Sequence, residues 1–218
     1  IGLIGGLTWQ STAEYYSAIN RAVNQRLGGV HSARIVLQSL DFGEIKACID
    51  RDDWRTIAGI MITATKSLEL SGDDCIVFCA NTAHKVADEV RASTRLPLIH
   101  IADETAKVLK TVGIAKVGLL GTRFTMMDPF FRDALTRLGI EALVPNEEDR
   151  GFVHSSILDE MAKGVYLPST KARFIDIIEK LARDGAEGII EGCTEIPFLI
   201  KPEDCAIPLF NTTEIHAL

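Results

Sequence analysis

The chain has 218 residues, of which 47% are hydrophobic and 24% charged, and its formal net charge at pH 7 is -7. Such a composition is typical of a soluble globular protein with one large or two small domains. Acidic residues are scattered, and no run of lysine and arginine with interleaved aromatic residues occurs. No apolar stretch approaches the roughly 20 residues that cross a bilayer. The composition therefore argues against nucleic acid or membrane as a partner.

The ends of the chain bear on its location. The start has neither the basic region nor the long apolar run of a secretory signal, so we expect a cytoplasmic protein. The chain begins at Ile1 inside an apolar strand pattern and ends at Leu218 inside a helical one. We therefore expect a few further residues beyond these ends.

Short apolar runs alternate with amphipathic stretches of helical length. In chain order, we expect strands at 1–4, 33–40, 75–78, 117–120 and 188–191, and helices at 11–27, 54–71, 82–93, 127–138, 150–163 and 169–184. Glycines close most of the helical stretches, which supports these boundaries. The strand–helix–strand alternation predicts an α/β fold with parallel sheets.

The two halves of the chain resemble each other. Residues 1–5 read IGLIG and residues 117–121 read VGLLG, and a loop with hydroxyl side chains follows each. Later in each half, an apolar strand ends in a short polar segment, Ala80-Asn81-Thr82 in one and Cys193-Thr194-Glu195 in the other. We predict two similar doubly wound parallel-sheet domains related by pseudo-two-fold symmetry. The expected boundaries are 1–98 plus 208–218 for the first lobe and 99–207 for the second.

These four polar loops all follow expected strands. Open parallel sheets bind ligands outside the carboxyl ends of their strands. We therefore expect the active site in the cleft between the domains, with Ala80 and Cys193 at equivalent positions on opposite walls.

The five cysteines show no spacing typical of zinc, so we expect no metal site. Cys48, Cys75 and Cys205 are interpreted as buried, inert thiols. Cys193 differs because it stands at a strand end just before a helix. There the free N–H groups of the helix would favour the thiolate and lower the pKa of Cys193.

Polar residues near these loops are candidates for substrate binding. A substrate carboxylate could bind the helix start at Asn81 and Thr82, or the Thr194 hydroxyl, while Glu195 could hold a substrate ammonium group. His84 could orient its loop or be a structural histidine. The basic candidates for a second carboxylate are Arg51 and Lys163, unless they are surface charges. The expected contacts are Leu7, Thr8, Asn81, Thr82, Ala83, Thr122, Thr125, Thr194 and Glu195.

Several ordered motifs resemble the aspartate/glutamate racemase family. They are residues 5–12 (GGLTWQST), 27–33 (LGGVHSA), 41–42 (DF), 80–88 (ANTAHKVAD), 118–122 (GLLGT) and 191–196 (EGCTEI). The resemblance implies two α/β domains, often in a homodimer, and racemisation without pyridoxal or another cofactor. One thiolate removes the Cα proton and a second thiol returns a proton to the opposite face. Aspartate or glutamate is the substrate that the resemblance implies.

The sequence departs from this pattern at the first thiol, where Ala80 precedes Asn81-Thr82 and Cys79 stands one residue earlier. Neighbouring residues on a strand point to opposite faces, so Cys79 should face the packing if position 80 faces the cleft. Three alternatives remain. A bulge could bring Cys79 into the site, Cys193 could act alone with water, Thr8, Thr82 or His84 serving the other face, or position 80 has been altered by engineering.

Other functions fit parts of the sequence. A one-thiol decarboxylase or isomerase resembling the arylmalonate decarboxylases would keep the fold and Cys193, and a hydantoin racemase is a related option. A binding protein that has lost catalysis would also explain Ala80. A nucleotide-binding Rossmann protein fits poorly, because Gly2-x-x-Gly5-Gly6 is not G-x-G-x-x-G, although Asp41 lies near the ribose-binding position.

Overall fold

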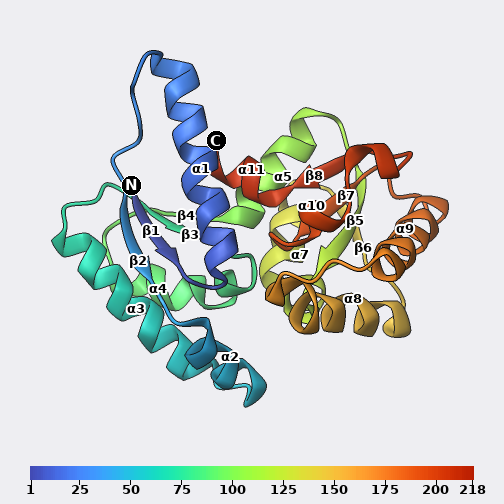
Figure 1. The fold of residues 1–218 in the computed structure, drawn as a ribbon, viewed down its shortest axis with the longest axis horizontal. Helices are drawn as coiled ribbons and strands as arrows, with labels where there is room; N and C mark the ends of the chain where they lie inside the picture. Colours follow the sequence, from blue (N-terminus) through green and yellow to red (C-terminus); the bar gives the residue numbers. More distant parts are fainter. The chain divides into compact units, whose positions relative to one another are not determined.

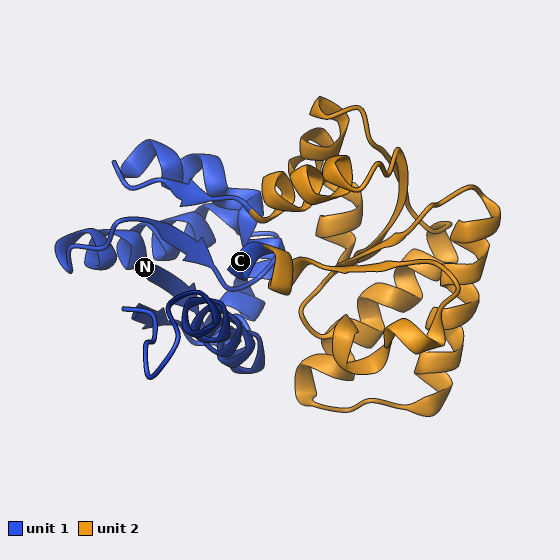
Figure 2. Cartoon of the chain, turned by 90° about the horizontal axis from the view of Figure 1, so that it is seen from above, with its two compact units in different colours: residues 1–100, 216–218 blue, residues 101–215 orange.

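Two parallel four-stranded sheets organise the chain in the computed structural model, which describes residues 1–218 (Figure 1). They belong to two compact units, Ile1–His100 with His216–Leu218 and Ile101–Ile215 (Figure 2). The strand orders are β2-β1-β3-β4 and β6-β5-β7-β8, and every neighbouring pair is parallel. The prediction of an α/β fold with two similar parallel sheets is confirmed.

The first unit is built around strand β1, which pairs with β2 on one side and β3 on the other. Its elements are β1 (Gly2–Gly5), α1 (Trp9–Leu27), β2 (Val36–Ser39), α2 (Phe42–Asp50), α3 (Trp54–Leu70), β3 (Ile76–Phe78), the 3-10 helix η1 (Thr82–Val86), α4 (Ala87–Ser93) and β4 (Leu98–Ile99).

The second unit repeats this plan around β5, which pairs with β6 and β7. Its elements are α5 (Ile101–Thr111), β5 (Lys116–Gly121), α6 (Arg123–Met127), α7 (Pro129–Arg137), β6 (Glu141–Leu143), α8 (Glu147–Asp159), η2 (Met161–Lys163), α9 (Pro168–Arg183), β7 (Ile189–Gly192), α10 (Ile196–Leu199), η3 (Pro202–Asp204) and β8 (Leu209–Asn211). Helix α11 (Thr212–Ala217) runs from this unit into the last residues of the first.

The unit boundary near the C-terminus differs from the one expected. The sequence-based boundary placed 208–218 in the first lobe. In the structure β8 pairs with β7, so this segment belongs to the second sheet, and the first unit gains only His216–Leu218. The Nε2–H group of His216 donates to the carbonyl oxygen of Ile99 at 2.9 Å, and its Nδ1 lies 2.8 Å from the hydroxyl oxygen of Tyr15.

Several elements differ from the expected helices, among them α5, which no expected helix covered. The stretch 82–93 is a 3-10 helix followed by α4 rather than one α-helix. The short helix α2 was not expected; the Asp41 carboxylate caps it by accepting from the N–H of Gly43 at 2.8 Å. Asp52, with φ 56°, separates α2 from α3.

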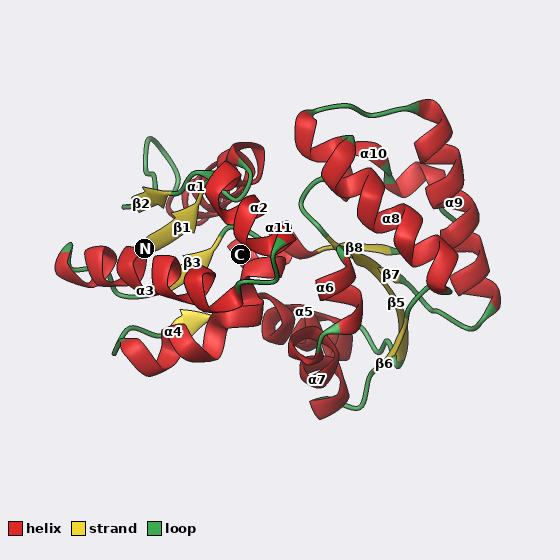
Figure 3. Ribbon diagram, turned by 90° about the horizontal axis from the view of Figure 1, so that it is seen from below, coloured by secondary structure: helices red, strands yellow, loops and turns green.

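Helices cover both faces of the second sheet (Figure 3). Leu120 and Ile189 pack with α8 and α9 on one face, whereas Leu119 and Ile190 pack with α5 and α7 on the other. Burial on both faces explains why these strands are continuous apolar runs in the sequence. No helix in the structure has the length and apolar character that crossing a membrane would require.

The turn after β1 depends on a glycine. Gly6 has φ 79°, in the left-handed region, and a Cβ at this position would lie 2.0 Å from the carbonyl oxygen of Leu40. Its N–H donates to the hydroxyl of Thr12 at 2.7 Å. This turn delivers Leu7 and Thr8 to the carboxyl end of the sheet.

We predict that Gly6→Ala lowers the free energy of unfolding by at least about 3 kcal/mol, because backbone strain and a backbone clash add together. Gly164→Ala is the matched control, since its backbone is left-handed (φ 76°, ψ 18°) and no atom lies within 4 Å of the added Cβ. Strain alone should cost the control about 1 to 2 kcal/mol. Urea denaturation measures both, and equal losses would contradict the assignment of Gly6.

Candidate active site

The loop after β7 carries the thiol that the sequence singled out. Gly192 ends the strand where β5 and β7 approach closely, and a Cβ there would lie 2.7 Å from the carbonyl oxygen of Leu120. Gly121 and Gly192 are register partners, so the loops that begin at Thr122 and Cys193 leave neighbouring strands. The sheet thus brings together two of the polar segments expected at its carboxyl edge.

Cys193, Thr194 and Glu195 form one buried hydrogen-bonded group. The Sγ–H of Cys193 donates to Oε2 of Glu195 at 3.0 Å, and the Thr194 hydroxyl donates to the same oxygen at 2.8 Å. Exposed fractions of the three residues are 8%, 6% and 4%. The Glu195 carboxylate therefore faces the thiol directly, a contact that the sequence did not reveal.

This environment raises the pKa of Cys193 well above its ordinary value. Burial is the largest cause, the negative charge of Glu195 adds to it, and backbone N–H groups of Thr194 and Glu195 oppose it more weakly. The expectation of a lowered pKa was wrong, because burial outweighs the N–H groups at the helix start. At neutral pH the group is a thiol that donates to a carboxylate.

Hydroxyl groups and a phenol lie near this group in the second unit. The Thr122 side chain caps α6 by accepting from the N–H of Thr125 at 3.4 Å, and both threonines are buried. Burial and the charges of Glu195 and Cys193 raise the pKa of Tyr166, so its phenol shares their electrostatic environment. Tyr166 was not expected from the sequence, because it lies in none of the motifs named above.

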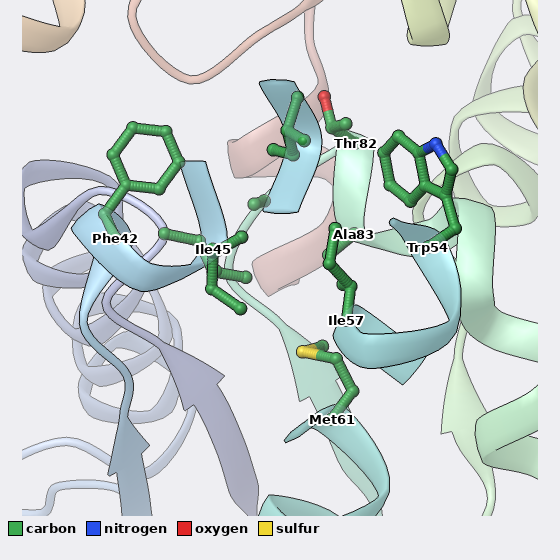
Figure 4. A pocket seen from close by; sticks show the side chains of 10 residues that line it. Phe42, Ile45, Trp54, Ile57, Met61, Thr82 and Ala83 are labelled. Atoms are coloured by element: carbon green, nitrogen blue, oxygen red, sulfur yellow. The ribbon is translucent and has the colours of Figure 1, made fainter. Parts of the chain in front are cut away.

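In the first unit, the expected residues gather at the carboxyl ends of β1 and β3. Thr8 is buried and caps α1, with its hydroxyl 3.1 Å from that of Ser11. Asn81 is also buried and precedes η1. The residues of the expected site that line one pocket of this unit are Leu7, Ala80, Thr82 and Ala83 (Figure 4).

Cys79 faces the other way. Its side chain is fully buried in the cluster with Leu3, Tyr15, Ile19 and Val77, and burial strongly raises its pKa. Ala80 lines the pocket, so the two neighbours point to opposite sides as strand geometry predicts. The bulge that would have turned Cys79 into the site is not present.

His84 supports the loop before η1. Its Nδ1–H donates to the carbonyl oxygen of Ala80 at 3.0 Å and lies 3.3 Å from that of Asn81. The rings of His100 and His216 lie 4.6 Å and 5.4 Å from its own. Burial, followed by the charges of these two histidines, lowers the pKa of His84, so the ring is neutral at pH 7. It is not among the residues lining the pocket.

The two basic candidates are exposed. Arg51 is the C-cap of α2, with a guanidinium nitrogen 3.6 Å from Sγ of Cys48, and Lys163 ends η2. Neither forms an ion pair with a carboxylate of the chain, so both charges are available to a ligand. No group of three or more His, Cys, Asp or Glu side chains is arranged to hold a metal ion.

The fold and this group define a two-unit α/β protein with a buried thiol that donates to a carboxylate. The chain belongs to the Asp/Glu/hydantoin racemase family, whose model matches residues 4–218. Similar solved structures include a Yersinia pestis protein assigned as a candidate Asp/Glu racemase (46% identity, 99% of this chain and 94% of that one, TM-score 0.92). An aspartate racemase homologue from Pyrococcus horikoshii is 33% identical over 99% of this chain and 94% of its own (TM-score 0.83).

A third relative is the broad-specificity amino-acid racemase RacX of Bacillus subtilis. It is 23% identical over 165 residues, which are 76% of this chain and 70% of that protein. The family resemblance inferred from the motifs is thus confirmed along nearly the whole chain.

The buried carboxyl group of Glu191, next to the thiol loop, was not expected from the sequence. Glu191 on β7 is 4% exposed, and its Oε1 has no hydrogen-bond partner. Burial, helped by the charge of Glu214 and opposed by that of Lys201, raises the pKa of Glu191 from 4.5 to about 8. The signal in the sequence that could have indicated this group is an acidic residue within an otherwise apolar strand.

We predict that Glu191→Gln increases the free energy of unfolding at high pH. The folded protein binds the Glu191 proton more tightly than the unfolded chain, so this stabilisation is complete below pH 4.5 and is lost as pH rises toward 8. Glutamine resembles the protonated acid and does not titrate. The difference between variant and wild type should be near zero at the acidic end and reach about 5 kcal/mol above pH 8.

Urea denaturation across this pH range measures the difference. The exposed Glu203→Gln is the control and should follow the wild type at every pH. A Glu191→Gln curve parallel to the wild type would show that the carboxyl group titrates normally.

Proposed function

We propose that this protein is an amino-acid racemase that moves the Cα proton without pyridoxal, with Cys193 as the proton carrier. The observation that supports this most is the buried hydrogen bond from Sγ of Cys193 to Oε2 of Glu195, 3.0 Å long. A thiol in contact with a carboxylate can exchange its proton with that partner without solvent. General acid/base catalysis requires a group that can both take and return a proton, and this pair can do both.

Glu195 gives the thiol two usable states. In the resting state the thiol holds the proton and can donate it to a carbanion. When the proton moves to Glu195, the thiolate can take the Cα proton and becomes a thiol again, while Glu195 keeps its own proton. The Thr194 hydroxyl, 2.8 Å from Oε2, holds the carboxylate in place. This role for Glu195 replaces the binding of a substrate ammonium group.

Removing a Cα proton without a cofactor also requires stabilisation of negative charge on the substrate carboxylate. The candidates for this are the hydroxyl and amide groups at the carboxyl ends of the strands. They are Thr8, Asn81 and Thr82 in the first unit, and Thr122 and Thr125 in the second.

This chain lacks a second thiol to carry a proton, so it cannot use the two-thiol mechanism that the family resemblance implies. The family motif has a thiol where this chain has Ala80, and Cys79 points into the core. His84 is neutral and bonded to backbone. Thr82 or a water molecule then serves the other face, more slowly than a thiol. The rate of Cα proton exchange should exceed the rate of inversion, and the exchange rates of the two enantiomers should differ. The equilibrium between the enantiomers is unchanged.

For the substrate we propose aspartate or glutamate. Arg51 and Lys163 are cations without an ion pair in the chain, and the Pyrococcus relative is an aspartate racemase homologue. A second candidate is decarboxylation of a malonate-type acid, which Ala80 favours because that reaction needs a proton on one face only. Release of carbon dioxide from such an acid, without Cα exchange of amino acids, would identify it.

We predict that Cys193→Ser slows the loss of the Cα-H signal of aspartate or glutamate in D2O at least about 100-fold, because general acid/base groups contribute about that much. Glu195→Gln should also slow it, since glutamine cannot accept the thiol proton. Proton NMR measures exchange, and chiral chromatography of the same samples measures inversion.

Cys205→Ser is the matched control, because this partly buried thiol lies outside the proposed group. It should exchange like the wild type. Undiminished exchange in Cys193→Ser would overturn the proposal.

A further inference from the structure

The first unit contains an apolar pocket whose interior has no role in the proposed proton transfer. About 330 Å³ of space lies between its walls, a volume that includes open solvent at its mouth. Its walls come from α2 and α3, and its rim comes from the loop after β1 and from η1 (Figure 4). The lining residues are Leu7, Phe42, Ile45, Ile49, Trp54, Ile57, Met61, Ala80, Thr82 and Ala83.

The position of the pocket in the sheet is that of a ligand site. Leu7 follows β1, Phe42 begins just after β2, and Ala80 follows β3. The pocket therefore opens at the carboxyl ends of three adjacent parallel strands, where open α/β sheets bind ligands. It also includes Ala80 and Thr82, two positions of the motif that resembles the family's first thiol loop.

The lining defines what the pocket can bind. None of its ten residues is charged, and Thr82 at the rim carries the only side-chain hydroxyl. Ile57 and Met61 on the inner wall are 2% and 0% exposed. A carboxylate placed here would lose its hydration without gaining a partner, which is costly. An alkyl group would gain favourable burial instead.

The outer wall is held in place by a charged neighbour. The Nζ of Lys85 lies 4.2 Å from the centre of the Trp54 ring, so the indole is fixed between this cation and the pocket. A pocket with a fixed aromatic wall loses little entropy when a ligand enters.

We propose that this pocket binds the apolar side chain of an amino acid, and that the substrate range extends to aliphatic amino acids such as leucine. The proposal rests on the proposed racemase function and adds a second class of side chain. Thr82 at the rim separates the apolar interior from the polar groups available to the substrate carboxylate. Leucine is the chosen probe because its side chain is a four-carbon alkyl group without a polar atom.

Binding can be observed independently of catalysis at Met61. With [13C-methyl]methionine labelling, leucine should shift the Met61 methyl signal, assigned from Met61→Leu. The signals of the other three methionines, all in the second unit, serve as references. Leucine should also lose its Cα-H signal in D2O at a rate within tenfold of the better acidic substrate.

A narrowed pocket tests the link between binding and exchange. Ile45→Phe, on the buried wall, should lower the ratio of leucine to acidic-substrate exchange at least tenfold. Ile45→Ala, which widens the pocket, should shift the preference toward phenylalanine. Ala47→Leu on the exposed side of α2 is the control and should leave the ratio unchanged.

The outcomes separate the two proposals. A shifted Met61 signal without exchange of any amino acid would support the pocket and overturn the racemase function. Exchange of aspartate or glutamate without a Met61 shift or leucine exchange would overturn the pocket and leave the function intact. An exchange ratio that is unchanged in both Ile45 variants would also overturn the proposal that the pocket binds side chains. If the Met61 signal does not shift and no amino acid exchanges its Cα proton, both proposals are overturned.

Discussion

Parallel pairing on both sides of a central strand is the constraint on which the rest of the structure depends. β1 pairs with β2 and β3, and β5 pairs with β6 and β7, so the loops after these strands emerge at one edge of each sheet. Glycines at the strand ends, such as Gly6 and Gly192, allow the close approach. The polar segments are therefore grouped by pairing, and their chemistry follows from what surrounds each one.

Burial then determines how the thiol can act. An exposed cysteine at a helix start would be a thiolate, but Cys193 is buried beside the carboxylate of Glu195 and holds its proton. The same burial keeps Cys79 out of the chemistry on the other unit. In the proposed function, this buried thiol is the group that exchanges a proton with the substrate.

The sequence was sufficient to predict the fold class, the duplication and the opposite orientations of Cys79 and Ala80, because these follow from strand periodicity and repeated motifs. It did not predict the pairing of β8 with β7 or the short helix α2, since three-residue strands and short helices carry little periodic signal. The longer helix α5 was missed although its buried residues Ile101, Thr105 and Leu109 follow helical spacing. The sequence also could not predict that Oε2 of Glu195 accepts from Cys193 or that Glu191 is buried without a partner. Those features depend on side-chain contacts and on burial, which motifs do not specify.

The protonation state of Cys193 is the most direct test of this account. The rate of alkylation by iodoacetamide can be followed against pH by mass spectrometry of the peptide that contains Cys193, in the wild type and in Glu195→Gln. The account predicts a Cys193 pKa above the ordinary value of 9.0 in the wild type and a lower one in the variant, because the negative charge of Glu195 is removed. A wild-type pKa below the ordinary value, unchanged in Glu195→Gln, would contradict it.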